Sequence, residues 1–415
     1  MMKNNVSDNQ TKTAYLEQNY GKTILPLSLF DNLIRPGEKP IEIFFFYRKE
    51  AFIPRLQDSL SEAIQYYNLF SSRLIMIDDH KFALQYCTDG ALINVLSPID
   101  ETIDSVNLEN IKKMMVHVKT LPGEPLFAVT GIPLRDGIIG AISCSHSVAD
   151  GVSLLLFMYA WMCITEGKNF LLPSKQRLFT GHPIRSSAID KVFIPALSEL
   201  SKGIQTKMSH ANNIETHMTM EYFSDEFLAK IKIEAKSDDE KYLISNHQIM
   251  TSFLLKKYYK NILPHADRII LRTPINLRDI HPDVDKIYIG TALFVNFTEF
   301  TKDEIDKMSI YQIAHRLKES MMSVRNEKYA KKISFLSPYG IEFTSEMLSE
   351  YLPHNVNTDV VSTNLTHLKD LESMFLGPET GSILYVDLPF QPSFTLFKEK
   401  SDKLFAQITS RYPFT

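Results

Sequence analysis

A histidine and an aspartate lie four residues apart in the stretch "ISCSHSVADGVSLLLF", residues 142–157. His146 can take and return a proton near neutral pH, because the ordinary pKa of imidazole is about 6.5. Asp150 would be its fixed partner within the same turn. Small residues precede the histidine and allow a ligand to approach closely: Gly140, Ala141, Ser143 and Ser145. The pattern indicates a general base presented at the end of a buried strand.

The same residues also have a purely structural interpretation. A histidine at a strand end is commonly a core or surface residue without a catalytic role. Asp150 is a good N-cap for the apolar segment that follows, and Gly151 eases the turn. Spacing alone leaves both interpretations open.

Hydrophobic periodicity predicts the elements that position this loop. Two strands are expected in "LFAVTGIPLRDGIIGAISCS", joined by a tight turn at Asp136-Gly137, and the second strand leads to His146. Amphipathic helices are expected over residues 54–67, from Ser245 with a capping box to Gln248, and over 309–326. Strands and helices alternate in both halves, which favours a mixed α/β fold.

The length of 415 residues exceeds what one hydrophobic core usually fills. Periodicity fades from residue 169 to residue 213. We therefore predict an N-terminal domain over 1–168 that carries the His146 loop, a crossover linker over 169–213, and a C-terminal domain over 214–415.

Composition gives no support to some classes of function. The 45 basic and 49 acidic residues give a net charge of −4, which offers no support for nucleic acid or an anionic membrane as a partner. Three cysteines without a CxxC pair, a polar N-terminal stretch and no apolar run of ~20 residues fit a cytoplasmic protein. The absence of Gly-x-Ser-x-Gly disfavours a serine hydrolase.

The remaining histidines suggest no metal site. Those in no recognisable ligand spacing, for which solvated or helix-surface roles are expected, include His117, His247, His315 and His367. No metal ligand is predicted.

Several segments, in order, carry a resemblance to a known family. "HSVADG" matches the His-x-x-x-Asp-Gly motif of the thioester-dependent acyltransferase superfamily, and "LPLSLFDNL", "LQDSLSEAIQYYNLFSSRL" and "PINLRDIHP…YIGTALF" resemble features of its BAHD branch. The resemblance spans about residues 20 to 300. It implies two chloramphenicol-acetyltransferase-like domains with a channel between them, a monomer, and no permanently bound cofactor or metal.

The resemblance also implies roles for individual residues. His146 would be the general base for attack of a hydroxyl or amine on acyl-CoA, without a covalent enzyme intermediate. Asp150, followed by Gly151, would orient the loop by pairing with Arg278. The triplet Ser362, Thr363 and Asn364 resembles an element that meets substrate and the developing oxyanion.

Departures from the family keep alternatives open. Ser145 stands where peptide-synthetase condensation domains carry a first histidine, and the hallmark Asp-Phe-Gly-Trp-Gly is absent, with "LESMFLGPET" as its nearest substitute. The first alternative is a condensation-type enzyme that uses donors bound to a carrier protein. The second is a non-catalytic binding protein of the same fold.

Overall fold

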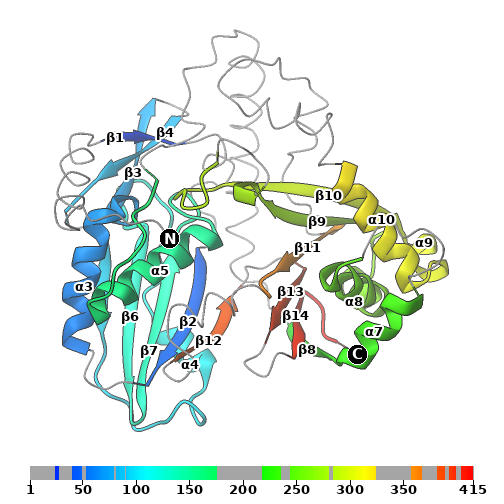
Figure 1. The fold of residues 1–415 in the computed structure, drawn as a ribbon, viewed down its shortest axis with the longest axis horizontal. Helices are drawn as coiled ribbons and strands as arrows, with labels where there is room; N and C mark the ends of the chain where they lie inside the picture. The colour runs from blue at the N-terminus through cyan, green and yellow to red at the C-terminus, as the bar shows by residue number, and fades with distance from the viewer. Residues whose placement is uncertain are drawn as a thin grey trace, which may run out of the picture. The chain divides into compact units, whose positions relative to one another are not determined.

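The chain forms two compact units, each containing a β-sheet and helices (Figure 1). The computed structural model describes residues 24–27, 40–48, 53–78, 81–88, 90–174, 217–234, 244–279, 284–323, 357–366, 381–387, 392–398 and 403–414. Unit 1 comprises residues 1–182, 282–292 and 372–389, and unit 2 comprises 183–281, 293–371 and 390–415.

Unit 1 is built around a five-stranded sheet in the order β12-β2-β7-β6-β5. Its strands are β2 (Ile41–Tyr47), β5 (Leu92–Val95), β6 (Phe127–Leu134), β7 (Gly137–Cys144) and β12 (Gly381–Asp387). Only β5 and β6 pair in parallel. A separate three-stranded sheet contains β1 (Ile24–Pro26), β4 (Lys81–Tyr86) and β3 (Ser72–Asp78).

Both faces of the five-stranded sheet are covered, which explains why β2, β6 and β7 are buried along their whole length. On one face, α3 (Ile53–Tyr66) packs against α5 (Gly151–Glu166), and Trp161 of α5 meets the ring of Phe45 edge-on. On the other face, Phe44 and Phe46 join a core with residues of and next to α4 (Leu108–Met114). The apolar sequence of α5 therefore reflects burial.

The predicted hairpin before His146 is confirmed, but its turn differs from the expectation. The turn residues are Arg135 and Asp136, and Gly137 is the first residue of β7, without a positive φ. A Cβ at Gly137 would lie 2.2 Å from the carbonyl oxygen of Tyr47. Glycine is needed here because β2 passes close by.

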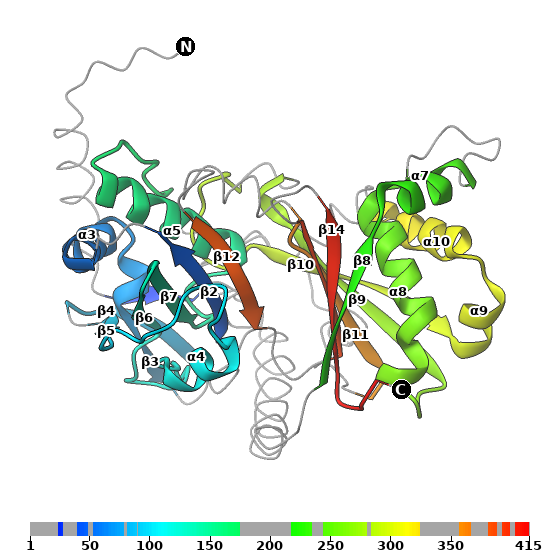
Figure 2. The ribbon, with the colours of Figure 1, turned by 90° about the horizontal axis from the view of Figure 1, so that it is seen from below.

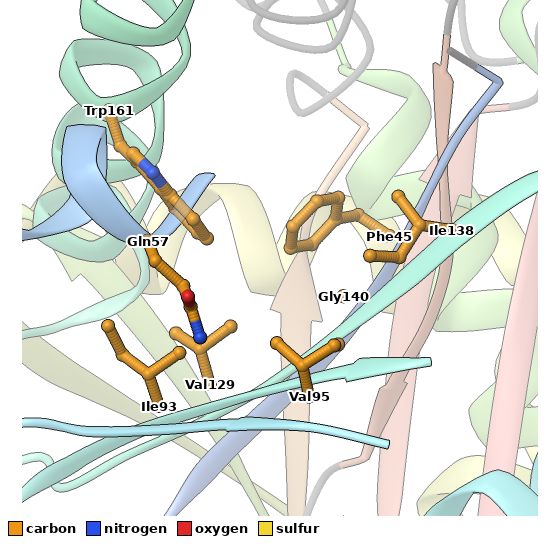
Figure 3. A pocket seen from close by; sticks show the side chains of 9 residues that line it. Phe45, Gln57, Ile93, Val95, Val129, Ile138, Gly140 and Trp161 are labelled. Carbon is orange, nitrogen blue, oxygen red and sulfur yellow. The ribbon is translucent and has the colours of Figure 1, made fainter. Parts of the chain in front are cut away.

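A small apolar cavity lies between α3, α5 and this sheet (Figure 3). Its volume of about 20 Å³ holds roughly one water-sized sphere. It is lined by Phe45, Gln57, Ile93, Val95, Val129, Gly131, Ile138, Gly140 and Trp161. None of the predicted site residues lines it.

Unit 2 contains a six-stranded sheet in the order β10-β9-β11-β13-β14-β8. The strands are β8 (His217–Phe223), β9 (Arg268–Asn276), β10 (Leu293–Thr301), β11 (Asp359–Asn364), β13 (Ser393–Lys398) and β14 (Leu404–Ser410). Helices α7 (Asp225–Glu234), α8 (Asn246–Ile262), α9 (Lys302–Lys307) and α10 (Ile310–Ser323) gather on one face (Figure 2).

The predicted helices are confirmed, including their starts. Ser245 and Gln248 form a reciprocal capping box on α8, and Ser309 accepts a hydrogen bond from the backbone N–H of Gln312 at the start of α10. The mixed α/β class is confirmed as well. Most of the predicted crossover, residues 175–213, lies outside the part of the chain that the structure describes.

Two segments of the second half belong to unit 1. Residues 372–389 supply β12, which pairs with β2, and residues 282–292 meet the loop that carries His146. The domains predicted from the sequence are continuous stretches of chain, so they do not place these two segments in the N-terminal domain. None of the described helices is long and apolar enough to span a membrane.

Candidate active site

The loop after β7 is fixed at its first residue, Ser145. The Ser145 N–H donates to the carbonyl of Leu126 at 2.8 Å, and Ser145 Oγ accepts from the N–H of Ser147 at 3.1 Å. The N–H of Val148 donates to the Ser145 carbonyl at 3.2 Å. Ser145 is fully buried. A small hydroxyl residue at this position therefore shapes the turn that presents His146.

Asp150 is the N-cap of α5, and both of its carboxylate oxygens are engaged. Oδ1 accepts from the N–H of Ser153 at 2.8 Å, and Oδ2 accepts from the N–H of Ala292 at 3.0 Å. The side chain is completely buried. Asp150 thus ties the loop both to its own helix and to a segment of the second half.

The segment that ends at Ala292 makes further bonds to the loop and to α5. Thr291 Oγ1 donates to the His146 carbonyl at 2.9 Å. Ser153 Oγ donates to the carbonyl of Gly290 at 2.8 Å and accepts from the Gly290 N–H at 3.0 Å. Gly290 has φ of +139°, and a Cβ there would lie 2.9 Å from the Tyr288 hydroxyl. Both the positive φ and the close Tyr288 hydroxyl therefore favour glycine at position 290.

His146 is partly exposed as a residue, but its imidazole is buried at Nδ1. Nδ1 has no hydrogen-bond partner among the residues described. Burial lowers the pKa of His146 to about 4, against the opposing effects of the Asp150 charge and the Ala149 backbone. The ring is therefore neutral at pH 7, the state in which imidazole can accept a proton.

Gly151 opens α5 next to the capping aspartate. A Cβ built at this position would meet no atom within 4 Å, and Gly151 has no positive φ. Neither backbone strain nor a neighbouring side chain demands a glycine, so the position leaves space at the helix N-terminus beside the loop.

Arg278, the predicted partner of Asp150, belongs to unit 2. It lies in the short 3₁₀ turn Leu277–Asp279 and is buried. Its backbone N–H and Nη1 both donate to Asn276 Oδ1, at 3.1 and 3.2 Å. The pairing with Asp150 stays a prediction.

The triplet at residues 362–364 lies on β11, also in unit 2. Ser362 Oγ is 2.8 Å from Thr251 Oγ1 and 3.3 Å from His247 Nε2, so this hydroxyl faces α8. Asn364 Oδ1 accepts from the N–H and hydroxyl of Thr366. Thr363 points to the opposite face and is partly exposed. Contact with substrate stays a prediction for all three.

Sequence reasoning missed the surroundings of two histidines. The expectation of a solvated or helix-surface role is wrong for His247, whose pKa burial lowers to about 4. His117 is exposed as expected, but its pairing with Glu42 was not foreseen. A signal existed for His247, because His247 and Thr251 lie four residues apart on a face that also carries Leu254. His315 pairs with Glu319 on the surface of α10, and His367 lies outside the described residues.

The described part of the chain contains no group of three or more His, Cys, Asp or Glu side chains that could hold a metal ion.

The chain is similar to known proteins in sequence and in fold. The model of the Transferase family matches residues 10–358. An uncharacterized acetyltransferase of Arabidopsis thaliana is 24% identical over 67% of this chain and 66% of its own length. BAHD acyltransferase DCR of the same organism is 27% identical over 28% of this chain and 26% of its own length. The chain thus matches less than two thirds of the length of either relative.

Solved structures share the fold. Vinorine synthase has a TM-score of 0.63 at 14% identity, covering 94% of this chain and 92% of its own. TRI101 of F. graminearum, in complex with ethyl coenzyme A, has a TM-score of 0.65 at 12% identity, with coverage of 94% and 95%. These likenesses confirm the predicted chloramphenicol-acetyltransferase-like fold, and the match over most of the sequence shows that this chain belongs to the Transferase family of BAHD acyltransferases.

Proposed function

We propose that the protein transfers an acyl group from acyl-CoA to the hydroxyl or amine of a small molecule, with His146 as the general base. The observation that carries this proposal is the state of His146. Its ring is neutral, and the residue is partly exposed on a loop that Ser145, Asp150 and Thr291 hold in place. A base must combine such accessibility with a fixed orientation.

The reaction balances without a covalent enzyme intermediate. The acceptor oxygen or nitrogen attacks the thioester carbonyl while His146 takes the acceptor proton. The C–S bond then breaks, a C–O or C–N bond has formed, and the imidazolium returns the proton to the CoA thiolate. A pKa of about 4 makes His146 a weak base in the free protein, but it ensures that the ring is unprotonated at neutral pH.

Several residues are proposed to support this step. Asp150 orients the loop, with Arg278 as a further partner, and Gly151 leaves room beside the histidine. Thr363 and Asn364 are proposed to contact substrate. Ser362 is also proposed to belong to the substrate site, with its hydroxyl hydrogen-bonded to Thr251.

The choice of acyl-CoA as donor is supported by family membership and by a structural neighbour that was solved with ethyl coenzyme A. A carrier-bound donor is the alternative, as in the condensation domain of a calcium-dependent antibiotic synthetase, which also shares the fold at a TM-score of 0.61.

The test is release of free thiol from a panel of acyl-CoAs mixed with pooled alcohols and amines. Wild type is compared with His146→Ala and with His265→Ala, a control that removes an exposed imidazole from unit 2. We expect acceptor-dependent release that survives in His265→Ala and falls at least about 100-fold in His146→Ala, the usual contribution of a general base.

Other outcomes separate the alternatives. Release only from acyl groups attached to a carrier protein would identify a condensation-type enzyme. Ligand binding without release from any donor would identify a binding protein. Equal release by wild type and His146→Ala would exclude the general-base role.

A further inference from the structure

Two buried hydroxyls on β13 lack hydrogen-bond partners within the part of the chain that the structure describes. Ser393 is 1% exposed and Thr395 is 0% exposed, and neither hydroxyl oxygen has a partner among the described residues. Burying a hydroxyl without a partner is unfavourable, and native proteins seldom retain two such groups side by side without a reason.

Both hydroxyls project from the face of the unit 2 sheet that its helices leave uncovered. Phe394 and Leu396 belong to the core formed with α8, and successive side chains of a strand point to opposite faces. Ser393 and Thr395 therefore point to the face opposite these helices.

Three of the four in-register neighbours of the two hydroxyls are polar. Thr395 pairs in register with Thr363 of β11 and with Gln407 of β14. Ser393 pairs with Thr409 of β14 and with the apolar Val361 of β11. A sheet face that served only as a packing surface would carry apolar side chains here, as the helix face of the same strands does.

The borders of this polar face define which ligand group fits. On β9 and β11, Arg272 and Asp359 form an ion pair at 2.7 Å and compensate each other's charge. Next to Thr395, Phe397 stacks on Phe405 at 5.2 Å. Hydroxyls and an amide between a neutralised ion pair and aromatic rings suit a neutral group that both donates and accepts hydrogen bonds.

Some residues near the two hydroxyls are exposed. Thr363 is partly exposed beside Thr395. At the edge strand β8, Met218 and Met220 are 46% and 42% exposed, and Met220 pairs with Gln407. Exposed thioethers adapt to apolar parts of a ligand.

We propose that Ser393 and Thr395 form a substrate subsite that binds a neutral hydroxyl or amide group. This inference rests on the proposed transferase function. Two substrates offer the required chemistry: the acceptor through a hydroxyl, and acyl-CoA through the amides of its pantetheine arm.

The experiment uses the full chain and the variants Thr395→Val and Ser393→Ala. Thr165→Val is the matched control, because Thr165 is equally buried but its hydroxyl bonds Ser59 Oγ at 2.7 Å and the Trp161 carbonyl at 2.8 Å. Three quantities are measured: the melting temperature, the Kd of coenzyme A by calorimetry, and the KM of the acceptor that the turnover screen identifies.

We expect Thr395→Val and Ser393→Ala to melt at the same temperature as wild type or higher, because each variant removes an unsatisfied hydroxyl. The affinity for either the acceptor or coenzyme A should weaken about 3- to 10-fold, the effect of one lost neutral hydrogen bond. A raised acceptor KM assigns the subsite to the acceptor, and a raised Kd assigns it to coenzyme A. Thr165→Val should melt lower with unchanged affinities.

A lower melting temperature for Thr395→Val, or unchanged affinity for every ligand, overturns the proposal. The calorimetric and thermal measurements need no turnover. If wild type transfers no acyl group, the KM measurement is replaced by thermal shift of wild type and variants with the same alcohols and amines. Failure of the proposed transferase function is then distinguishable from failure of the proposed subsite.

Discussion

At the scale of single residues, the protonation state of His146 sets the expected pH dependence. Burial lowers the pKa of His146 from 6.5 to about 4, so the ring stays neutral through the physiological range. The unfolded chain binds the proton more readily than the folded one. The stability contributed by the neutral ring is therefore fully present above about pH 6.5 and is lost as pH falls toward 4.

We predict that kcat/KM of the transferase does not titrate with a midpoint near 6.5. It should be flat with respect to His146 above about pH 6 and should decline as pH approaches 4. The measurement is a pH–rate profile, with enzyme stability checked at each pH by circular dichroism. A midpoint between 6 and 7 would show that the ring is well solvated in the working enzyme.

The pair of His117 and Glu42 should respond to pH in the opposite sense. The two ring nitrogens face acceptors, Glu42 Oε1 at 2.5 Å and the Lys112 carbonyl at 2.9 Å, so only the protonated ring can donate to both. The bond to Glu42 raises the pKa of His117 above 6.5, although burial and the positive charge of Lys112 oppose this.

We predict that His117→Gln lowers the melting temperature at pH 5 to 6 and has little effect at pH 9. The stability from a raised pKa is fully present below the unfolded value of 6.5 and is lost as pH rises through the folded value. Melting of wild type and variant across this range measures the effect. His315→Gln is the control, since His315 lies 3.5 Å from an exposed carboxylate on α10. A pH-independent difference would contradict the prediction.

At the scale of elements, one serine joins α5 to the segment before β10. Ser153 Oγ both donates to and accepts from the backbone of Gly290. We predict that Ser153→Ala reduces the free energy of unfolding by about 1–3 kcal/mol, because two buried backbone groups lose their partner.

Ser252→Ala on α8 is the control for that variant. The Ser252 hydroxyl bonds only the carbonyl of Gln248 in its own helix among the contacts described, and such bonds contribute little to stability. Urea unfolding of both variants gives the comparison. Equal losses would show that the link to Gly290 adds no stability.

Two cross-strand glycines in the unit 1 sheet should differ in their tolerance of a side chain. A Cβ at Gly140 would lie 2.1 Å from the ring of Phe45, whereas a Cβ at Gly131 would first meet Ile138 Cδ1 at 3.3 Å beside the cavity (Figure 3). We predict that Gly140→Ala destabilises by about 1–3 kcal/mol and that Gly131→Ala stays within about 1 kcal/mol of wild type. Chemical denaturation measures both, and a larger loss at Gly131 would contradict the packing described.

Local patterns predicted these elements well. The capping box of α8, the amphipathic helices and the hairpin before His146 depend on residues close in sequence, and periodicity and capping chemistry report them directly. The N-cap role of Asp150 could be read the same way. The partners Ala292, Thr291 and Gly290 could not, because they lie about 140 residues away and use mainly backbone atoms, which leave no sequence pattern.

At the scale of the whole molecule, the boundaries of unit 1 do not follow the sequence. Its central sheet needs β12, from residues 381–387, to pair with β2. The two predicted halves, 1–168 and 214–415, describe the chain's order but not this exchange, because strand pairing over such a distance has no local signal.

We predict that a fragment of residues 1–182 is poorly soluble. Without β12, the seven-residue β2, "IEIFFFY", becomes an edge strand with unpaired backbone groups. Soluble yield and circular dichroism of the fragment are compared with those of a version carrying residues 381–387 on a flexible linker. Equal solubility of the two would show that β2 needs no partner on that side.

The pairing of β2 with β12 also sets the timing of folding during synthesis. About 330 residues separate Tyr47 from its partner Gly381, which at about 5–20 residues per second corresponds to roughly 15 to 70 s of translation. Throughout that interval the ribosome displays a nascent strand of three consecutive phenylalanines that cannot yet complete its sheet. Chaperones that bind extended apolar segments would therefore bind this strand. Codon changes that slow translation between β2 and β12 would lengthen the period in which the exposed strand can aggregate.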